Sequence, residues 1–350
     1  MSVKPDTWPA GARWCALVGL SALFMGMLEL IRIPAALLLG PMLGAVVMAT
    51  RGGPVRIARP VFFLAQGAIG VMIAGNLPAT VFPAIAARWP IFLISTLSTL
   101  VAAATLGWSL ARSGLLPGTT AIWGSSPGAA TAMTLMSESY GADMRLVAFM
   151  QYLRVACCAI IAALMARIFG TPAVSHVAPV VAPTFEAEGL ALTLVITVAG
   201  SLIGVRAKIP AGAMLVPMVL GMAVKLSGLG ALVLPLPLLA LCYAVIGWGI
   251  GNRFTPDVVA YAARAFPRVL GSILALIAMC GGMAMVLVHV AGVDPLTAYL
   301  ATSPGGADSV SIIATSTRVD IPFVIAMQVA RFFLVILTGP VLARRLSAAR

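Results

Sequence analysis

Long runs of apolar residues, separated by short loops that hold most of the charges, constrain this chain more than any other feature. Hydrophobic residues fill 61% of its 350 positions and charged residues fill 9%, whereas a soluble globular domain is about one quarter charged. Runs of about 17 to 25 apolar residues are typical of transmembrane helices. The runs show no alternation of polar and apolar residues, which excludes a β-barrel. We therefore predict an all-α polytopic membrane protein.

Five runs in each half of the chain have the length and composition expected of a membrane span. One further apolar segment in each half is interrupted by Pro and Gly, at 117–139 and at 295–316. The predicted spans are 14–31, 35–50, 60–75, 89–111 and 146–167 in the first half, and 187–205, 210–226, 233–251, 268–291 and 321–343 in the second.

The two halves repeat one another in sequence. Ser126-Pro127-Gly128 returns 177 residues later as Ser303-Pro304-Gly305, and each copy is followed by a Gln and an Arg at the same spacing. Matches at offsets of 176 and 177 extend over more than a hundred residues, which indicates an internal duplication. We predict a first repeat at 1–170, a Pro-rich linker at 171–188 and a second repeat at 189–350.

The distribution of basic residues predicts how these repeats cross the membrane. If each interrupted segment enters the membrane and returns on the same side, each repeat has five full spans and one re-entrant hairpin. With a cytoplasmic amino terminus, 15 of the 22 Lys and Arg residues then lie in the cytoplasm and 5 outside. If the segments cross completely, the split is only 11 to 9. We therefore predict inverted repeats, the architecture of secondary transporters, with both termini cytoplasmic.

A Ser-Pro-Gly break inside a membrane exposes backbone groups that lipid cannot satisfy, so it persists only where protein or a water-filled cavity covers it. Two breaks at equivalent places predict a shared polar cavity near the midplane. Ser126 is a good helix N-cap and Pro127 a good first helical residue, so we expect a short helix to begin there. Its free N–H groups, near Gly128 to Ala130, would favour an anion.

Arg154 and Arg331 fall in the middle of predicted spans, where an unpaired charge costs at least ~2.5 kcal/mol. Two explanations stay open. The arginines neutralise a carboxylate, sulfonate or phosphate group of a substrate, or each ties a hairpin tip or pairs with Asp308, Glu138 or another buried acid.

Gln151 and Gln328 lie three residues before these arginines, on the same helical face. They either donate hydrogen bonds to a substrate or satisfy carbonyls of the hairpin. The two copies differ at one especially informative position, where Thr131 in the first corresponds to Asp308 in the second. Asp308 binds a coupling cation, carries a proton or pairs with the nearby arginine, and its neighbour Ser309 favours an ion-coupling role.

These considerations define a predicted site at the two breaks. The predicted ion-coupling residues are Asp308, Thr131 and Ser309. The predicted substrate-binding residues are Ser125, Ser126, Gly128, Ala129, Gln151, Arg154, Ser303, Gly305, Gly306, Gln328 and Arg331.

The remaining reactive residues suggest neither a metal nor a cofactor. The two histidines stand apart, and the five cysteines lie inside apolar runs without a CxxC motif, so we expect the cysteines to be small core residues. Asp143 and Asp320 precede the last span of each repeat and are predicted to be N-caps. The net charge of +12 comes from basic residues at the ends of apolar runs, which is typical of topological anchors and not of nucleic-acid binding.

The duplicated motifs resemble the AbrB family of Gram-negative membrane proteins. The residues that carry the resemblance are IPAALLLGPM and IPAGAMLVPM, together with SSPGAATAMTLMSESYGAD and TSPGGADSVSIIATSTRVD, each of the last two followed by Q-x-x-R. The resemblance covers about 15–343. It implies a transport fold related to inverted-repeat transporters and cation/proton antiporters, with elevator-like movement of a hairpin-bearing core. The labels of ammonia monooxygenase and regulator that the family carries find no support in the residues, since two isolated histidines cannot build a copper or iron site.

The sequence therefore predicts a secondary active transporter of a small organic anion, driven by Na+ or H+, in a bacterial inner membrane. No P-loop is present, so energy for transport would come from ions or from a partner. A membrane-bound enzyme or a regulatory membrane subunit is the alternative. We expect a small anionic substrate and membrane lipid as partners, with a homodimer as the assembly to test, and no nucleic acid.

Overall fold

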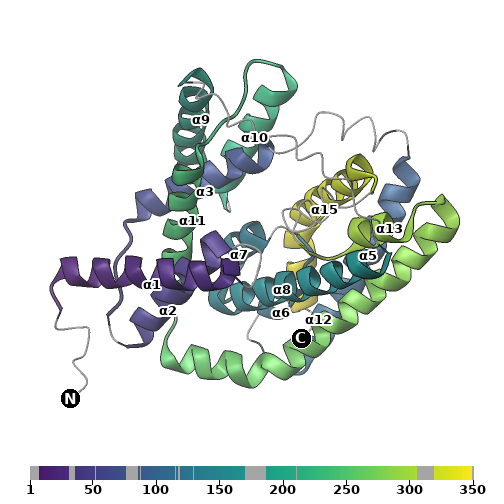
Figure 1. Ribbon diagram of the computed structural model, residues 1–350, viewed down its shortest axis with the longest axis horizontal. Helices are drawn as coiled ribbons and strands as arrows, with labels where there is room; N and C mark the ends of the chain where they lie inside the picture. Colours follow the sequence, from purple (N-terminus) through teal and green to yellow (C-terminus); the bar gives the residue numbers. More distant parts are fainter. Residues whose placement is uncertain are drawn as a thin grey trace. The chain divides into compact units, whose positions relative to one another are not determined.

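The computed structural model describes residues 8–30, 36–51, 53–75, 86, 88–114, 116, 119–128, 130–169, 187–209, 211–305 and 319–348. All regular secondary structure over these residues is helical, which confirms the predicted all-α class. Figure 1 shows the helices in chain order, which are α1 (Ala10–Leu30), α2 (Ala36–Thr50), α3 (Arg59–Gly75), α5 (Trp89–Arg112), α6 (Thr120–Ser125), α7 (Ala130–Ser139), α8 (Met144–Phe169), α9 (Ala187–Arg206), α10 (Gly212–Leu226), α11 (Leu236–Gly251), α12 (Pro256–Ala291), α13 (Pro295–Thr302) and α15 (Ile321–Ala348).

Six of the described helices are long and apolar enough to cross a membrane, which indicates a membrane protein. They are α1, α5, α8, α9, α12 and α15. The apolar helices α2, α3, α10 and α11 are shorter, at 15 to 17 residues. A straight helix needs about 20 residues to span the hydrocarbon core, so these four are short for a complete crossing.

The predicted spans agree with the observed helices within a few residues, except at α12. This helix begins at Pro256, well before the predicted start at residue 268. Arg264, Pro267 and Arg268 suggested a loop in the sequence, but the helix continues through all three. The two arginines are exposed, so the helix can carry their charge without burying it. Phe266 on the early part of α12 contacts Phe149 of α8, with ring centroids 6.4 Å apart.

The chain forms two compact units, and each unit contains helices from both halves of the sequence. Unit 1 consists of Met1–Ala79 and Ala178–Ala260, and unit 2 of Thr80–Val177 and Tyr261–Arg350. The first three helices of each half therefore belong to unit 1, and the later ones to unit 2. A sequence repeat is consequently not a compact unit by itself. The compact units do not bear on where one sequence repeat ends and the next begins, and most of the predicted linker at 171–188 lies outside the described residues.

Close helix contacts hold unit 1 together. The helix α2 packs against α1 and α11, and α10 packs against α9 and α3; Figure 1 shows α3 beside α9 and α10. Glycines allow these approaches, because a Cβ at Gly251 would overlap the carbonyl oxygen of Met42, and a Cβ at Gly204 would overlap that of Gly212. Since lipid tails are as apolar as the helices, packing of small residues rather than hydrophobic burial stabilises such contacts.

In unit 2 the two halves of the sequence meet in one buried core. The helix α6 packs against α5 and α8, while α13 packs against α15 and α8. A cluster of small apolar side chains joins α5 to α12, and it contains both Ala103 and Cys280. These two residues are 177 positions apart, so they are equivalent in the duplication. The repeats therefore come together at matching positions in this unit.

Candidate functional site

The first Ser-Pro-Gly break lies between two short helices of unit 2. The helix α6 ends at Ser125 and α7 begins at Ala130. Ser126 is the C-cap of α6, with φ −63° and ψ 124°, and its hydroxyl donates to Ile122 O at 2.8 Å. The prediction that Ser126 caps the start of the next helix is therefore wrong. Proline disfavours helical geometry in the residue before it, so Pro127 ends α6 at Ser126 instead of starting α7.

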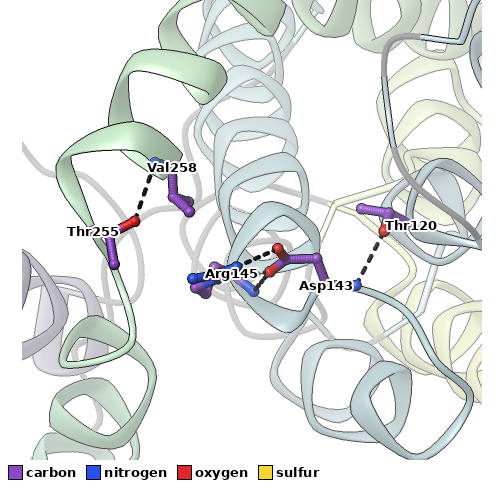
Figure 2. Close-up of polar contacts among 5 residues, drawn as sticks. All are labelled: Thr120, Asp143, Arg145, Thr255 and Val258. Carbon is purple, nitrogen blue, oxygen red and sulfur yellow. Dashed lines mark hydrogen bonds and ion pairs between the residues drawn. The ribbon is translucent and has the colours of Figure 1, made fainter.

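Both ends of the first hairpin lie together, as expected for a re-entrant segment. The Thr119 hydroxyl, before α6, donates to Tyr140 O at 3.2 Å, after α7. The Asp143 N–H, before α8, donates to the Thr120 hydroxyl at 3.0 Å, as Figure 2 shows. The second half repeats this last contact, because the Asp320 N–H donates to the Thr297 hydroxyl at 3.1 Å. Each interrupted segment thus begins beside the first turn of the long helix that follows it.

Asp143 and Asp320 cap these long helices, as predicted. The Asp320 carboxylate accepts from the Phe323 N–H at 3.0 Å, and the Asp143 carboxylate accepts from the Arg145 N–H at 3.0 Å. Asp143 also forms an ion pair with the Arg145 guanidinium at 2.7 Å, shown in Figure 2. Burial acts to raise the pKa of Asp143, but the hydrogen bonds and charge of Arg145 outweigh it and hold the pKa below its ordinary value.

Two side chains of α8 hold the first break. Gln151 Nε2 donates to Trp123 O at 2.8 Å and to Ser126 O at 3.0 Å. Arg154 donates to Ser126 O at 2.7 Å and to Gly128 O at 3.3 Å. These carbonyls lie at the end of α6 and in the break, where they lack partners within a helix. A cation at a helix C-terminus is also favoured by the helix dipole.

Two side chains of α15 hold the second break in the same way. Gln328 Nε2 donates to Leu300 O at 2.8 Å and to Ser303 O at 3.3 Å. Both contacts are those of Gln151 shifted by 177 residues. Arg331 donates to Thr302 O at 3.3 Å and to the Gln328 side chain. The duplication predicted from the sequence is therefore present in the hydrogen bonds of the fold.

These contacts support one of the two explanations that the sequence left open, namely that the Gln and Arg side chains tie the hairpin tips. They do not answer what balances the arginine charges. The side chains of Arg154 and Arg331 are 1% and 3% exposed. The hydrogen-bond partners of the two guanidinium groups among the described residues are the carbonyl oxygens of Ser126, Gly128 and Thr302 and the side chain of Gln328, all of them neutral.

Glu138, one of the two predicted acids, is exposed near the end of α7, whereas both arginines are buried. The other predicted acid, Asp308, lies outside the described residues. The helix α13 packs against α8 and α15 packs against α6, so the two breaks and the arginines that hold them lie in the same region of unit 2.

Several buried polar atoms near the first break have no hydrogen-bond partner among the described residues. They include Arg154 Nε, Gln151 Oε1, the Ser125 hydroxyl and the Trp123 indole N–H. Buried polar groups are normally satisfied, so a group of unsatisfied ones requires an explanation. Three are donors and one is an acceptor, which suits a ligand with anionic oxygens.

The predicted site residues differ in burial and in hydrogen bonding, and four of them lie outside the described residues. Thr131 is partly buried and shares a hydrogen bond with the Tyr152 hydroxyl at 3.1 Å. In the second break, the Gly305 N–H donates to the Ser303 hydroxyl at 3.4 Å. The predicted site residues Ala129, Gly306, Asp308 and Ser309 lie outside the described residues. The remaining predicted residues, on α6, α8 and α15 and in the two breaks, are buried.

Sequence reasoning missed Cys158, Cys280 and Tyr299. The Cys158 thiol and the Tyr299 hydroxyl both lie near the Ser303 side chain, and the Thr302 hydroxyl donates to Cys280 O at 3.1 Å. Inside apolar runs these residues looked like ordinary core residues. Cys158 and Cys280 are indeed buried, but the expectation that all five cysteines are core residues is wrong for Cys15, which is exposed on α1.

The described residues contain no group of three or more His, Cys, Asp or Glu side chains that could hold a metal ion. The polar chemistry of this region therefore rests on guanidinium, amide, hydroxyl and thiol groups.

Comparison with known proteins gives a consistent assignment over nearly the whole chain. A family model described as "Transition state regulatory protein AbrB" matches residues 37–347. The "Putative regulator AbrB" of Escherichia coli (strain K12) is 42% identical over 336 residues, which cover 96% of this chain and 97% of that protein. No solved structure matches the chain.

Proposed function

The chain belongs to the AbrB family, and we propose that it is a secondary active transporter of a small organic anion. The substrate would bind between the two Ser-Pro-Gly breaks and be driven by Na+ or H+. The membrane would be the bacterial inner membrane, which the chain crosses several times. The E. coli relative is named a regulator, and that name describes no transported compound.

One observation carries this proposal: two buried arginines hold the two breaks, and in the described part of unit 2 their hydrogen bonds go to carbonyl oxygens and a glutamine side chain and not to a carboxylate. A buried charge without a counter-ion is costly, and in membrane proteins such charges mark substrate and ion pathways. A carboxylate, sulfonate or phosphate would supply the missing counter-charge. It would also accept hydrogen bonds from donors such as Arg154 Nε, which has no partner among the described residues.

The two compact units support movement as part of the mechanism. Both breaks, and all four Gln and Arg side chains that hold them, belong to unit 2. We propose that unit 2 carries the substrate and moves against unit 1, in an elevator-like cycle of alternating access. Unit 1, with its closely packed glycine contacts, would be the scaffold and the place for a homodimer to form.

The same geometry supports the proposed inverted repeats. Because each hairpin begins and ends in one place, it adds no net crossing of the membrane. We count the shorter helices α2, α3, α10 and α11 as crossings, which gives five in each repeat; the six longer helices alone give three. Either odd number turns the second repeat upside down relative to the first. Inverted repeats with substrate at the meeting of broken helices are the architecture of many secondary transporters.

Uptake into proteoliposomes tests the proposal. Purified protein would be supplied with labelled carboxylates, sulfonates and phosphonates under an imposed Na+ or pH gradient. At least one anion should accumulate, and Arg154→Gln and Arg331→Gln should each reduce its uptake by roughly tenfold or more, the scale of one lost charged hydrogen bond.

The matched control is Arg145→Gln, which removes an arginine of the same helix α8 that is partly exposed and paired with Asp143. This variant should transport normally. Uptake that responds equally to all three substitutions would show a general loss of fold instead of a loss of binding. Absence of any gradient-driven anion uptake by the wild-type protein would favour the second candidate, a regulatory membrane protein, to which the name of the E. coli relative points.

A further inference from the structure

The second break has polar neighbours that the first break lacks. Tyr299 on α13 lies close to Ser303, and its equivalent in the first repeat, 177 residues earlier, is Ile122. Cys158 lies on α8, which packs against α13 and brings the thiol near Ser303, and its equivalent in the second repeat is Val335. The pairwise symmetry of the hairpins is therefore broken by a hydroxyl and a thiol, both beside the same serine.

These groups are buried and incompletely satisfied. Tyr299 is 6% exposed, Cys158 is 2% exposed and Ser303 is fully buried. The Tyr299 hydroxyl lies near Ser303, yet it has no partner in normal hydrogen-bond geometry among the described residues. A buried tyrosine hydroxyl usually finds a partner, so this one has an open donor position.

The same region holds the two arginine charges. Arg154 lies one helical turn before Cys158 on α8, where it donates to Ser126 O at 2.7 Å. Arg331 donates to Thr302 O, directly before Ser303. The open hydroxyl therefore lies next to a positively charged region and beside the backbone of the second break.

We propose that Tyr299, Ser303 and Cys158 form a hydrogen-bonding subsite for one oxyanion group of the substrate, beside Arg154 and Arg331. This subsite rests on the proposed anion transport and adds a specificity-determining element to it. Tyr299 donates the directional hydrogen bond, Ser303 orients that hydroxyl, and the arginines supply charge. Cys158 lies beside the subsite, so the reaction rates of its thiol measure which reagents enter the subsite.

Thiol modification tests the subsite without knowledge of the substrate. The probes are three methanethiosulfonates that differ in charge: the anionic sulfonatoethyl, the cationic trimethylammonioethyl and the neutral methyl reagent. Their rates of reaction with Cys158 would be measured by peptide mass spectrometry on the full chain in proteoliposomes, with Cys157→Ala to separate the adjacent thiols. Ionisation of the thiol cancels in the rate ratios, because all three reagents attack the same group.

The expected result is that Cys158 reacts at least about tenfold faster with the anionic than with the cationic reagent, because clustered cations raise the local concentration of anions. Cys15, exposed on α1, serves as the internal control and should show a smaller ratio of the anionic to the cationic reaction rate. Tyr299→Phe should lower the anionic rate by roughly tenfold, the scale of one hydrogen bond to a charged group. It should leave the neutral rate unchanged.

Tyr152→Phe is the matched control, since it removes a tyrosine hydroxyl that is bonded to Thr131 in the same unit. If the anionic preference persists but Tyr299→Phe behaves like Tyr152→Phe, the subsite is refuted while the anion site stands. If Cys158 shows no anionic preference, both the subsite and the proposed anion transport are contradicted. If Cys158 reacts with none of the reagents, no ligand reaches this region and the subsite is likewise refuted.

Discussion

At the scale of residues, the same pair of side-chain types stabilises the break in each repeat. In each repeat a glutamine and an arginine, one helical turn apart, satisfy the carbonyl groups that a Ser-Pro-Gly break leaves without helical partners. This arrangement makes a broken helix tolerable inside a membrane. It also leaves two guanidinium charges buried together, and that charge is the basis of the proposed function.

The glutamines should therefore be essential for stability. Gln151→Leu and Gln328→Leu each remove the donor to two buried carbonyls, and an unsatisfied buried group costs about 1 to 3 kcal/mol. Each variant should show a clear fall in melting temperature in detergent. Ser98→Ala removes a partly buried hydroxyl that is bonded within α5. It is the control, and its melting temperature should stay close to that of the wild-type protein. Near-normal melting of both Gln variants would contradict the role of these side chains in holding the breaks.

Asp143 should give the protein an acid-sensitive contact. Its folded-state pKa lies below the ordinary value, so its contribution is present above the unfolded pKa of ~3.9 and is lost as pH falls through the folded value. Asp143→Asn keeps a cap but removes the ion pair, so it should destabilise by under ~1 kcal/mol at neutral pH. The difference from wild type should vanish in acid. Asp320→Asn is the control, and an equal pH-dependent difference there would contradict the ion-pair explanation.

At the scale of elements, close packing at glycines determines which helices can neighbour one another. Gly204 and Gly251 bring the backbones of unit 1 into contact. Gly204→Val and Gly251→Val should therefore lower the melting temperature strongly, because overpacking typically costs about 1 to 3 kcal/mol. Gly19→Val on α1 has open space around its added side chain and should be tolerated. Equal stability of all three variants would show that unit 1 packs differently.

Most elements could be predicted from the sequence, because a membrane span needs a long apolar run and tolerates few charges. The start of α12 could not, since exposed arginines beside a proline look the same in a loop as in an extended helix. The first break was located correctly, yet the role of Ser126 was not. Ser-Pro fits either the end or the beginning of a helix, and Pro127 acts here on the residue before it.

The candidate site was predictable only where the duplication marked it. Gln151, Arg154 and their counterparts stood out because polar residues recur at the same spacing in both repeats. Tyr299 and Cys158 have apolar counterparts, so the duplication could not mark them. Tyr299 lies one turn before Ser303 on α13, whereas Cys158 comes near Ser303 only when α8 and α13 pack together, and local sequence does not encode that packing.

At the scale of the whole molecule, the two compact units do not coincide with the two sequence repeats. Each unit is assembled from equivalent parts of both repeats, as expected if an ancestral half-chain paired with a copy of itself. Five crossing helices per repeat predict an inverted arrangement with both termini in the cytoplasm. Reporter fusions should therefore place the termini inside and residues near 178 outside. Cytoplasmic reporter activity near 178 would contradict inversion.

The most direct test of the central claim is ligand-dependent thermal stability of the purified full chain. A panel of small carboxylates, sulfonates and phosphonates would be compared with matched neutral and cationic compounds. Ligand at 100 times its dissociation constant stabilises by about 2.7 kcal/mol. We predict that at least one anion raises the melting temperature, and that Arg154→Gln and Arg331→Gln remove this shift while Arg145→Gln keeps it. A shift that persists in both site variants, or one produced only by cations, would contradict an anion site at the two breaks.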